Sequence, residues 1–465
     1  MQKVTIVART IERDGDDFSA ANNSLAFLGS YLRKDSMVFS GKAAGICYMP
    51  DDYLSNGIQN DETALKRALG NAKSGHYSVF EHSHISFLIE TTKAMAMVLN
   101  STKLYTTSEK SARYTKMNPQ SGIEKDLYEK WNKKLFDIIK DTYGDKYTDK
   151  EAEKLAMENA RYFISVFTPT VMMFTVPFSR AILLCGWLDD MAKAMNDMVN
   201  SGYIGSENKT TLNYYSKLAE QAVELAKLIR ESLSLSKEEP ILVDHKDIGI
   251  DFFNNVATYR RLEFIQKTLK SVSNSTIANH DNVLINDFVK DNMYACTNIY
   301  SFACLAQEQR HRTLDYRIYS ICEKAFYIPA ILTKEEDIKD WNDDMNFMYK
   351  NTDVVCQGNL LFVHESGSFD NFYLKCKERV CMRAQKEIMD VTCSQILNMY
   401  KYCKGEIEHN SFYFLSPLNS ARLLSMVDDS GSEEPMVLPR CMWRGYSCKE
   451  PCKHTSYTCT KDRLL

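Results

Sequence analysis

The sequence predicts an α+β protein built of two tandem repeats, each a small sheet packed with long helices, and a short C-terminal tail. Short runs in which every second residue is apolar alternate with longer runs in which apolar residues recur every three or four positions, and these are the periods of strands and helices. The 465 residues exceed what one ordinary core holds. The same order of segments then begins again in the second half of the chain.

The first repeat is predicted to hold a half-buried strand and three long helices. In the strand, HISFLIE (His84 to Glu90), the side chains of Ile85, Phe87 and Ile89 alternate with other residues and share one face. Three stretches have the helical period: residues 126–141, 150–165 and 213–235.

A break in this pattern separates the repeats. Residues 236–247 (SKEEPILVDHKD) contain Pro240 and a cluster of charges, which is typical of a linker. Beyond the linker, the second repeat has a segment in the place that SHISFLIETTKAMAMVLNSTK has in the first, namely NMYACTNIYSFACLAQEQRHR. A helix is predicted later in this repeat, at residues 379–400. We therefore expect repeats at residues 1–240 and 241–437 and a cysteine-rich basic tail at residues 438–465.

Composition and charge argue against several classes of protein. With 44% hydrophobic and 25% charged residues, the chain has the composition of a soluble globular protein. A formal charge of −4 gives no reason to expect nucleic acid as a partner. No run approaches the roughly 20 apolar residues of a membrane span, and the N-terminus has no signal-peptide core. We expect a cytoplasmic protein that binds anions through local clusters of arginine.

The 14 cysteines do not indicate a disulfide scaffold, because a chain of this size does not need disulfide bonds to stabilise its fold. The spacing C-x6-C-x3-C-x-H-x4-C in the tail can hold zinc through four thiolates, or through three thiolates and His454. This is not the spacing of a standard finger, and a reduced tail without metal is the alternative, so we assign no metal site. The tail cysteines are Cys441, Cys448, Cys452 and Cys459, and the cysteines predicted to be reduced core residues are Cys47, Cys185, Cys296, Cys304 and Cys356.

A group of polar side chains follows the helical run of the second repeat. Spacings of three and four place Gln307, Arg310 and His311 on one side of a helix. Arginine offers a planar fork of donors with a permanent charge, so this group can clamp a phosphate or polarise a ring carbonyl. The alternative is the solvated, charged end of a helix.

A second polar group ends the stretch TTSEKSARY. In an extended loop, Glu109, Ser111 and Arg113 would point the same way, because alternate residues share a face. A carboxylate, a hydroxyl and a guanidinium together can receive a sugar phosphate. No general base adjoins Ser111 in the sequence, so hydrogen bonding suits it better than nucleophilic attack. The alternative is a surface loop.

Three further polar residues, His76, Glu81 and His82, precede the predicted strand. His-x4-Glu-His is not a zinc spacing of the HExxH kind. Histidines that bond locally at the start of a strand are the simpler interpretation.

The order of three segments resembles that of the flavin-dependent thymidylate synthases: GHYSVFEHSHISFLIE, then a helix, then TTSEKSARY. The match runs without a gap from Gly75 to Tyr114, but Ser101, Thr102 and Lys103 stand where that family has Arg-His-Arg. Upstream, AAGICY resembles the family's Ala-Ala-Arg-x-Cys-Tyr segment. Arg161 falls where the family carries a nucleotide-binding arginine. Later family positions differ: Pro177, Leu183 and Leu188 replace two Asn and an Arg.

The second repeat resembles the same family at the positions that the first repeat lacks. Gln307 and the Arg-His-Arg of residues 310–312 match the family helix, Ser320 falls at the loop serine, and Arg379 precedes an AQKEI segment. Cys322 and Glu323 replace the loop's Arg-Tyr. Further departures are Ser368 and Leu374 for Asn and Arg383 for His. Because each repeat keeps what the other has lost, we expect one composite site.

The resemblance implies an FAD-dependent methyltransferase that converts dUMP to dTMP with methylenetetrahydrofolate and NADPH. The catalytic residues would be Arg310, which stabilises charge on the uracil, and Ser111. The substrate would contact Glu109, Ser111, Arg113, Arg161, Gln307, Arg310 and Arg379. FAD would contact His76, Ser78, Glu109, Arg310, His311 and Arg312.

The resemblance also implies a homodimer that mimics the family's tetramer. Two alternatives remain open because of the departures from the family pattern. One is a different one-carbon modification at C5 of a pyrimidine nucleotide. The other is a nucleotide-binding relative without catalytic activity.

Overall fold

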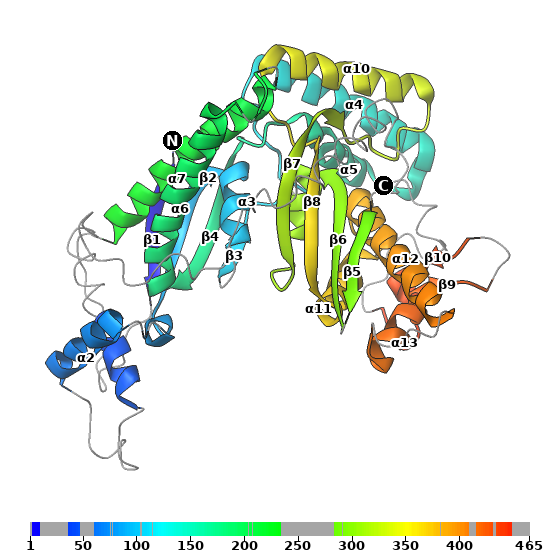
Figure 1. Cartoon of the computed structure of the whole chain (residues 1–465). Coiled ribbons are helices and arrows are strands. Elements are labelled where there is room, and N and C mark those ends of the chain that lie inside the picture. The colour runs from blue at the N-terminus through cyan, green and yellow to red at the C-terminus, as the bar shows by residue number, and fades with distance from the viewer. Residues whose placement is uncertain are drawn as a thin grey trace. The chain divides into compact units, whose positions relative to one another are not determined.

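The chain folds into two compact units that differ from a simple division into an N-terminal and a C-terminal half (Figure 1). The first unit is Met1–Lys110, Pro169–Glu207 and Leu212–Ile250, and the second is Ser111–Thr168, Asn208–Thr211 and Asp251–Leu465. The computed structural model describes residues 2–9, 36–46, 60–74, 76, 78–102, 105–113, 115–202, 204–206, 208–233, 283–290, 292–381, 383–408, 415–430 and 434–448. The predicted linker, Cys47, Cys452, His454 and Cys459 lie outside these residues.

The first unit contains a four-stranded antiparallel sheet with the spatial order β1-β2-β4-β3. Its strands are β1 (Lys3–Arg9), β2 (His84–Thr92), β3 (Thr106–Glu109) and β4 (Pro169–Pro177). All nine residues of β2 pair with β4. The predicted strand is confirmed, and Ile85, Phe87 and Ile89 are fully buried on one face of the sheet.

Apolar helices cover that buried face. After β2 comes α3 (Lys93–Ser101), whose first turn is capped by the Thr92 hydroxyl, and after β4 comes α6 (Phe178–Asn200). The predicted helix at 213–235 is α7 (Lys209–Ser232), and the Gln221 carbonyl on it accepts a hydrogen bond from Gln2 Nε2 at 2.7 Å. The first unit also holds α2 (Asp61–Ser74) and a 3-10 turn, Ser78–Glu81.

The second unit contains another four-stranded antiparallel sheet, with the order β5-β6-β8-β7. Its strands are β5 (Val283–Lys290), β6 (Met293–Ser301), β7 (Asp315–Phe326) and β8 (Asn359–Ser368). The strands of the two sheets, taken in chain order, are therefore arranged in the same way. The nine residues of β6 all pair with β8, as those of β2 do with β4. Ser301 caps the helix after β6, as Thr92 caps the helix after β2.

Helices from both halves of the sequence build the second unit. The predicted helices at 126–141 and 150–165 are α4 (Gly122–Tyr143) and α5 (Asp149–Ala160), the latter followed by a 3-10 turn, Arg161–Phe163. From the second half come α9 (Phe302–Glu308), α10 (Glu335–Thr352), α11 (Phe369–Arg379), α12 (Lys386–Glu408) and α13 (Pro417–Ser425). Short strands β9 (Val427–Asp428) and β10 (Met436–Val437) pair near the C-terminus.

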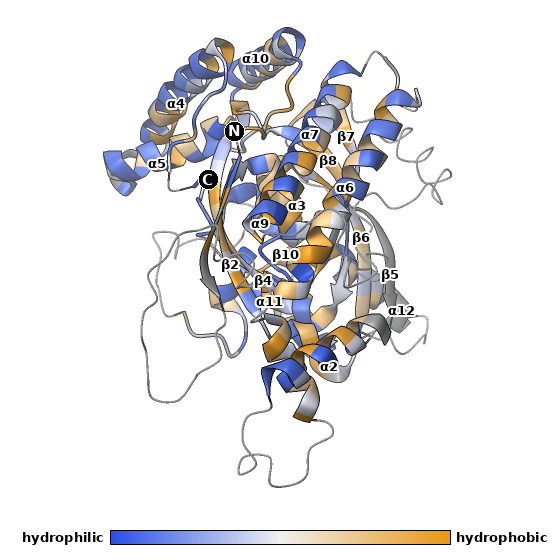
Figure 2. Cartoon of the chain, turned by 90° about the vertical axis from the view of Figure 1, so that its left-hand side faces the viewer, coloured by the Kyte–Doolittle hydropathy of each residue, from blue (hydrophilic) through white to orange (hydrophobic). Residues whose placement is uncertain are grey.

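The helices α4 and α10 hold the same place in the two halves, and they pack against each other (Figure 1). Each lies between the third and fourth strands of its half. Trp131 of α4 and Trp341 of α10 are fully buried and meet edge to face, with ring centroids 4.7 Å apart. The ribbons of α4 and α10 are largely hydrophilic with interspersed apolar positions (Figure 2), as expected for helices with one buried face.

The connections before the fourth strands also meet. Ser165 precedes β4 and Cys356 precedes β8, and the two residues form an antiparallel bridge. On either side of it, Val166 N–H donates to Val355 O at 3.1 Å and Gln357 N–H donates to Ile164 O at 2.8 Å. Equivalent segments thus contact each other, as at an interface between two identical subunits.

The prediction of one helix at residues 379–400 is wrong, because α11 ends at Arg379 and α12 begins at Lys386. Carbonyls at the end of a helix have no partner within it, and Arg440 satisfies two of them here: its N–H donates to Val380 O at 2.8 Å, and its side chain donates to Lys377 O. The loop 380–385 is the segment around which the candidate site assembles.

In the described part of the chain, no helix is long and apolar enough to span a bilayer.

Candidate functional site

Gln385, the last residue of the loop between α11 and α12, joins predicted site residues of both halves. Its Oε1 accepts a hydrogen bond from Arg161 Nη2 at 2.5 Å and another from Gln307 Nε2. Arg161 and Gln385 have only 3% and 4% of their surface exposed. The structure therefore brings together Arg161 and Gln307, which the sequence predicted to share a substrate site.

The orientation of the Gln385 amide is set by a chain of donors that ends at a carboxylate. Gln385 Nε2 donates to Tyr162 Oη at 2.7 Å, and Tyr162 Oη donates to Glu387 Oε2 at 2.8 Å. Glu387 also accepts from the Ser301 N–H and hydroxyl, at 2.8 and 2.7 Å. Burial raises the pKa of Glu387, while these hydrogen bonds oppose the rise. With the Gln385 N–H facing tyrosine, its oxygen must face Arg161 and Gln307.

Arg113 lies at the same loop. Its Nε donates to Glu158 Oε1 of α5 at 2.7 Å, and its Nη2 donates to the Arg383 carbonyl at 3.1 Å. Glu158 and the Arg383 carbonyl thus hold the guanidinium in place from two sides.

The expectation that Glu109, Ser111 and Arg113 share a face of an extended loop is wrong for Ser111 and Arg113. These two residues lie in a turn: the Arg113 N–H donates to Ser111 Oγ at 3.2 Å, and the Thr115 N–H donates to Ser111 O at 3.1 Å. Alternation along the chain does not apply in a turn. Within the described residues, no carboxylate or imidazole bonds to Ser111 Oγ, so the geometry supplies no base for a nucleophile.

The turn after α9 carries Arg310, His311 and Arg312. It is closed by the His311 N–H, which donates to Glu308 O at 2.9 Å, and the helix itself ends at Glu308. Arg310 is exposed, and its side chain has no hydrogen bond or ion pair within the part of the chain that is described. Arg312 is also exposed.

His311 is partly buried and contacts Arg379. Arg379 Nε donates to His311 Nε2 at 2.7 Å, and Arg379 Nη2 donates to Gln307 O at 3.2 Å. Burial, and then the positive charges of Arg379 and Lys375, lower the pKa of His311 to about 2. The imidazole is therefore neutral, and it accepts on Nε2.

The remaining predicted site residues belong to the first unit. His76 and Ser78 are exposed near the 3-10 turn. Glu109 is not available, because its carboxylate accepts from Lys93 Nζ at 2.5 Å and from Asn100 Nδ2 at 3.2 Å. The side chains of Glu109 and Lys93 are each 9% exposed, so this is a nearly buried ion pair.

Ser320 was expected in a loop, but it lies in a strand. It is part of β7, where it pairs with Phe362, and its hydroxyl is buried without a partner among the described residues. The third strand of the second half is longer than that of the first half: β7 has 12 residues and β3 has 4. The strand thus replaces the loop that carries Ser111 in the first half.

Sequence reasoning missed Gln385, Tyr162, Glu158 and Glu387 as site residues. Gln385 and Glu387 stand in the AQKEI segment, and Tyr162 follows Arg161, so each lies beside a residue that was singled out. Their roles depend on contacts across more than 40 residues, and no periodicity or spacing encodes these contacts.

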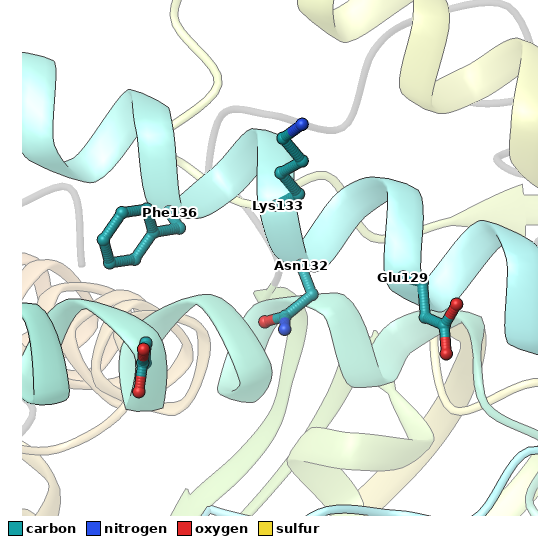
Figure 3. A pocket seen from close by; sticks show the side chains of 5 residues that line it. Glu129, Asn132, Lys133 and Phe136 are labelled. Carbon is teal, nitrogen blue, oxygen red and sulfur yellow. The ribbon is translucent and has the colours of Figure 1, made fainter.

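A groove of about 270 Å³ lies on the surface of the second unit, between α4 and α5 (Figure 3). Glu129, Asn132, Lys133 and Phe136 of α4 line it together with Glu153. None of these residues was predicted to bind substrate or cofactor. In the described part of the chain, no three His, Cys, Asp or Glu side chains are grouped to hold a metal.

The fold and the cluster define an antiparallel α+β protein with an arginine- and amide-rich polar site. Residues 31–185 match the family model of the thymidylate synthase complementing protein. The resemblance predicted from the motifs between Gly75 and Tyr114 is thereby confirmed over that segment. No curated protein matches the chain.

Solved structures also match the chain. One is the UMP/dUMP methylase PolB from Streptomyces cacaoi bound with 5-Br dUMP, with 13% identity over 40% of this chain and 77% of that chain and a TM-score of 0.26. Another is the flavin dependent thymidylate synthase ThyX from Helicobacter pylori complexed with FAD and dUMP, with 15% identity over 50% of this chain and 93% of that chain and a TM-score of 0.25.

Proposed function

We propose that the protein methylates dUMP at C5 to give dTMP, with FAD as cofactor and methylenetetrahydrofolate and NADPH as co-substrates. The site is composite: one half of the sequence supplies Ser111, Arg113 and Arg161, and the other supplies Gln307, Arg310 and Arg379. The observation that carries the proposal is the contact of Arg161 and Gln307 with one atom, Gln385 Oε1.

The likeness of the two halves supports an internal duplication. The two sheets have the same strand order, and hydroxyl caps follow the equivalent strands β2 and β6. The contact of Trp131 with Trp341 has the form of an interface between identical subunits. Sequence repeats at 1–240 and 241–437 account for these features, and the second compact unit combines parts of both.

The arginines suit the phosphate of the nucleotide. Arg113, Arg161 and Arg379 are each held by a protein acceptor: Glu158, Gln385 and the Gln307 carbonyl. Held in this way, a guanidinium loses little freedom when it binds an anion, and it can bond a phosphate through two parallel N–H groups. Ser111, fixed in its turn, would add a hydrogen bond to the nucleotide.

Arg310 suits the uracil ring. Its exposed guanidinium has no partner of its own within the described residues, so it can approach a carbonyl oxygen on which negative charge develops. Gln307, bonded to Gln385 and Ala303, would fix the position of the uracil ring in the site. The neutral His311 imidazole accepts from Arg379, so it holds no proton on Nε2 to transfer.

The donor set partly fits FAD. In the second unit, Arg310 and Arg312 are exposed cations that suit a diphosphate. Glu109 does not fit, because Lys93 and Asn100 occupy its carboxylate. When bound, FAD would supply the redox chemistry of the methylation, and the protein would supply orientation and charge.

We also propose that the chain pairs into a homodimer that mimics a tetramer, and that it acts in the cytoplasm. Zinc in the tail is not part of the proposal.

The activity is tested by incubating the protein with FAD, dUMP, methylenetetrahydrofolate and NADPH and measuring dTMP. Formation of dTMP that requires each component supports the proposal. A flavin-containing protein that consumes dUMP without forming dTMP would indicate a different one-carbon product. A protein that binds dUMP but takes up no flavin would indicate a nucleotide-binding relative.

A further inference from the structure

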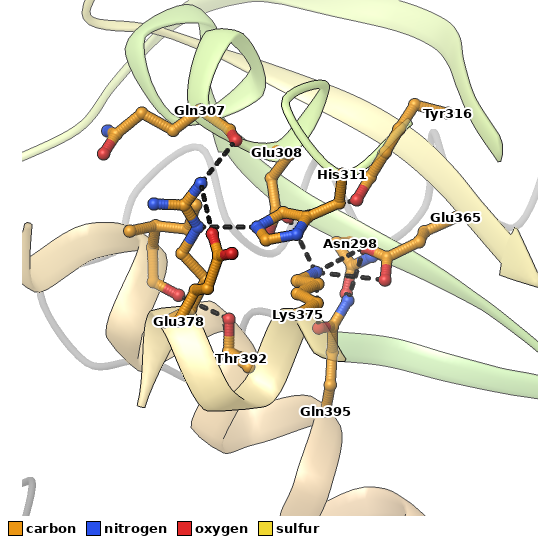
Figure 4. A network of polar contacts seen from close by, with 12 residues as sticks. Asn298, Gln307, Glu308, His311, Tyr316, Glu365, Lys375, Glu378, Thr392 and Gln395 are labelled. Carbon is orange, nitrogen blue, oxygen red and sulfur yellow. Dashed lines mark hydrogen bonds and ion pairs between the residues drawn. The ribbon is translucent and has the colours of Figure 1, made fainter. Parts of the chain in front are cut away.

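A fully buried cluster of charges lies beside His311, which belongs to the turn after α9 (Figure 4). It consists of Glu308 of α9, Lys375 of α11 and Glu365 of β8, and their side chains are 0% exposed. Charged groups are costly to bury, so such a cluster must be well paired in order to persist.

The pairing of Lys375 is complete. Its ammonium group has three N–H donors and faces three acceptor side chains: Glu308 at 2.8 Å, Glu365 at 2.8 Å and Gln395 at 2.9 Å. Burial opposes the charge of Lys375, but the two carboxylates outweigh it and raise its pKa. Lys375 is therefore fixed as a cation between three secondary-structure elements.

The carboxylates are also held by tyrosines. Tyr294 Oη donates to Glu365 Oε1 at 2.6 Å, and Tyr316 Oη donates to Glu308 Oε2 at 3.3 Å. Burial raises the pKa of Glu308 above its usual range, against the attraction of Lys375. Arg379 is a further cation near Glu308, and its charge favours the ionised carboxylate.

Two cations one helical turn apart on α11 thus hold the C-terminal turn of α9. Lys375 binds the Glu308 side chain, and Arg379 binds Gln307 O and His311 Nε2. Both contacts fall on residues 307–311, the segment that displays Gln307 and Arg310.

We propose that Lys375, through Glu308 and Glu365, is a positioning residue for this turn, and that it thereby sets the affinity of the dUMP site. The effect on affinity rests on the proposed function, whereas the effect on the turn does not. Lys375 itself touches no ligand.

The variants must separate positioning from folding. Lys375→Met alone leaves two carboxylates buried without a counter-charge and can prevent folding. The triple variant E308Q/E365Q/K375M removes all three charges with side chains of similar size, and it is expected to fold because a buried ion cluster can be replaced by neutral groups. Lys377→Met, the same substitution on a partly exposed residue of α11, is the matched control.

Hydrogen–deuterium exchange of peptides that cover residues 303–314 measures the turn without any ligand. We expect the triple variant to exchange about tenfold faster there, with α4 and α10 unchanged, and Lys377→Met to behave as wild type. Wild-type exchange of this turn in the folded triple variant would overturn the positioning role. Global loss of protection, seen also in α4 and α10, would equally contradict it, because the cluster would then support the whole fold.

Calorimetric titration with dUMP tests the consequence for the site. The triple variant should bind about tenfold more weakly with its FAD content unchanged, and Lys377→Met should bind as the wild type does. Equal dUMP affinity of wild type and triple variant would overturn the effect on the site. If the wild type binds no dUMP, the proposed function fails, and the exchange measurement still decides whether Lys375 positions the turn.

Discussion

Arg161 and Gln385 are 224 residues apart in sequence, and they share a buried hydrogen bond of 2.5 Å. Gln307 donates to the same oxygen. A contact between two residues of the second half, Gln307 and Gln385, is thus extended to an arginine of the first half. This three-residue contact is the structural basis of the composite site that we propose.

Replacing Gln385 with Ala should weaken dUMP binding about tenfold, which is about 1.4 kcal/mol. The substitution removes the acceptor that orients Arg161 and Gln307, and it leaves buried donors without a partner. Calorimetric titration measures the effect. Gln120→Ala, in an exposed loop, is the control. Unchanged affinity in a folded Gln385→Ala variant would show that this contact has no role in substrate binding.

The indoles of Trp131 and Trp341 should be energetically coupled. Trp131→Phe and Trp341→Phe each remove an indole N–H donor, to Asp344 and to Tyr327 O, and each should cost about 1–3 kcal/mol of unfolding free energy. Because the rings touch, the double variant should differ from the sum by about 0.5–1.5 kcal/mol. Urea unfolding gives these energies.

The control for this cycle pairs Trp131→Phe with Trp443→Phe. Trp443 stacks on Tyr373 and donates to Leu438 O, so it shares no described partner with Trp131, and the two effects should add within about 0.5 kcal/mol. Additivity in both cycles would mean that the α4–α10 contact contributes no coupling.

The stability of the protein should fall on acidification because of His311. Its pKa is lowered to about 2 in the folded protein, so the unfolded chain binds the proton first, below its ordinary pKa of about 6.5. The contribution of the neutral ring to the free energy of unfolding is complete above about pH 6.5, and it is lost as the pH falls toward 2. Between pH 6.5 and pH 5 the loss is about 2 kcal/mol.

His311→Gln cannot take up a proton, so its stability should decrease less between pH 7 and pH 5 than that of the wild type. Urea unfolding at the two pH values measures the difference, with His84→Gln, at an exposed position in β2, as the control. Equal pH dependence of His311→Gln and wild type would contradict the burial of a neutral imidazole.

Thiol reactivity should follow burial. Cys441 is exposed, whereas Cys356 is buried, and burial raises the pKa of its thiol to about 12. In the native protein Cys441→Ser should remove one equivalent of fast reaction with a thiol reagent, and Cys356→Ser should remove none. Loss of a fast equivalent in Cys356→Ser would mean that its surroundings open readily.

Much of the fold can be predicted from local patterns. The strand that holds Ile85, Phe87 and Ile89 and the helices α4, α5 and α7 have a clear period, and burial of their apolar faces follows directly. The prediction of reduced core cysteines is confirmed for Cys185, Cys296, Cys304 and Cys356.

The loop between α11 and α12 could not be predicted in this way. No glycine or proline marks the end of the helix in residues 379–385, and the donors to the carbonyls there come from Arg440, far along the chain. The roles of Gln385 and Lys375 depend on the same kind of long-range contact. Local periodicity carries no information about such partners.

The central claim is one dUMP site for each chain, built from both halves. Calorimetric titration of the FAD-loaded protein with dUMP measures the number of sites directly, and the same titration on Arg161→Ala and Gln307→Ala shows which half contributes. The account predicts one site for each chain, weakened by either substitution. Two sites for each chain, or one site that is insensitive to one of the substitutions, would contradict a composite site.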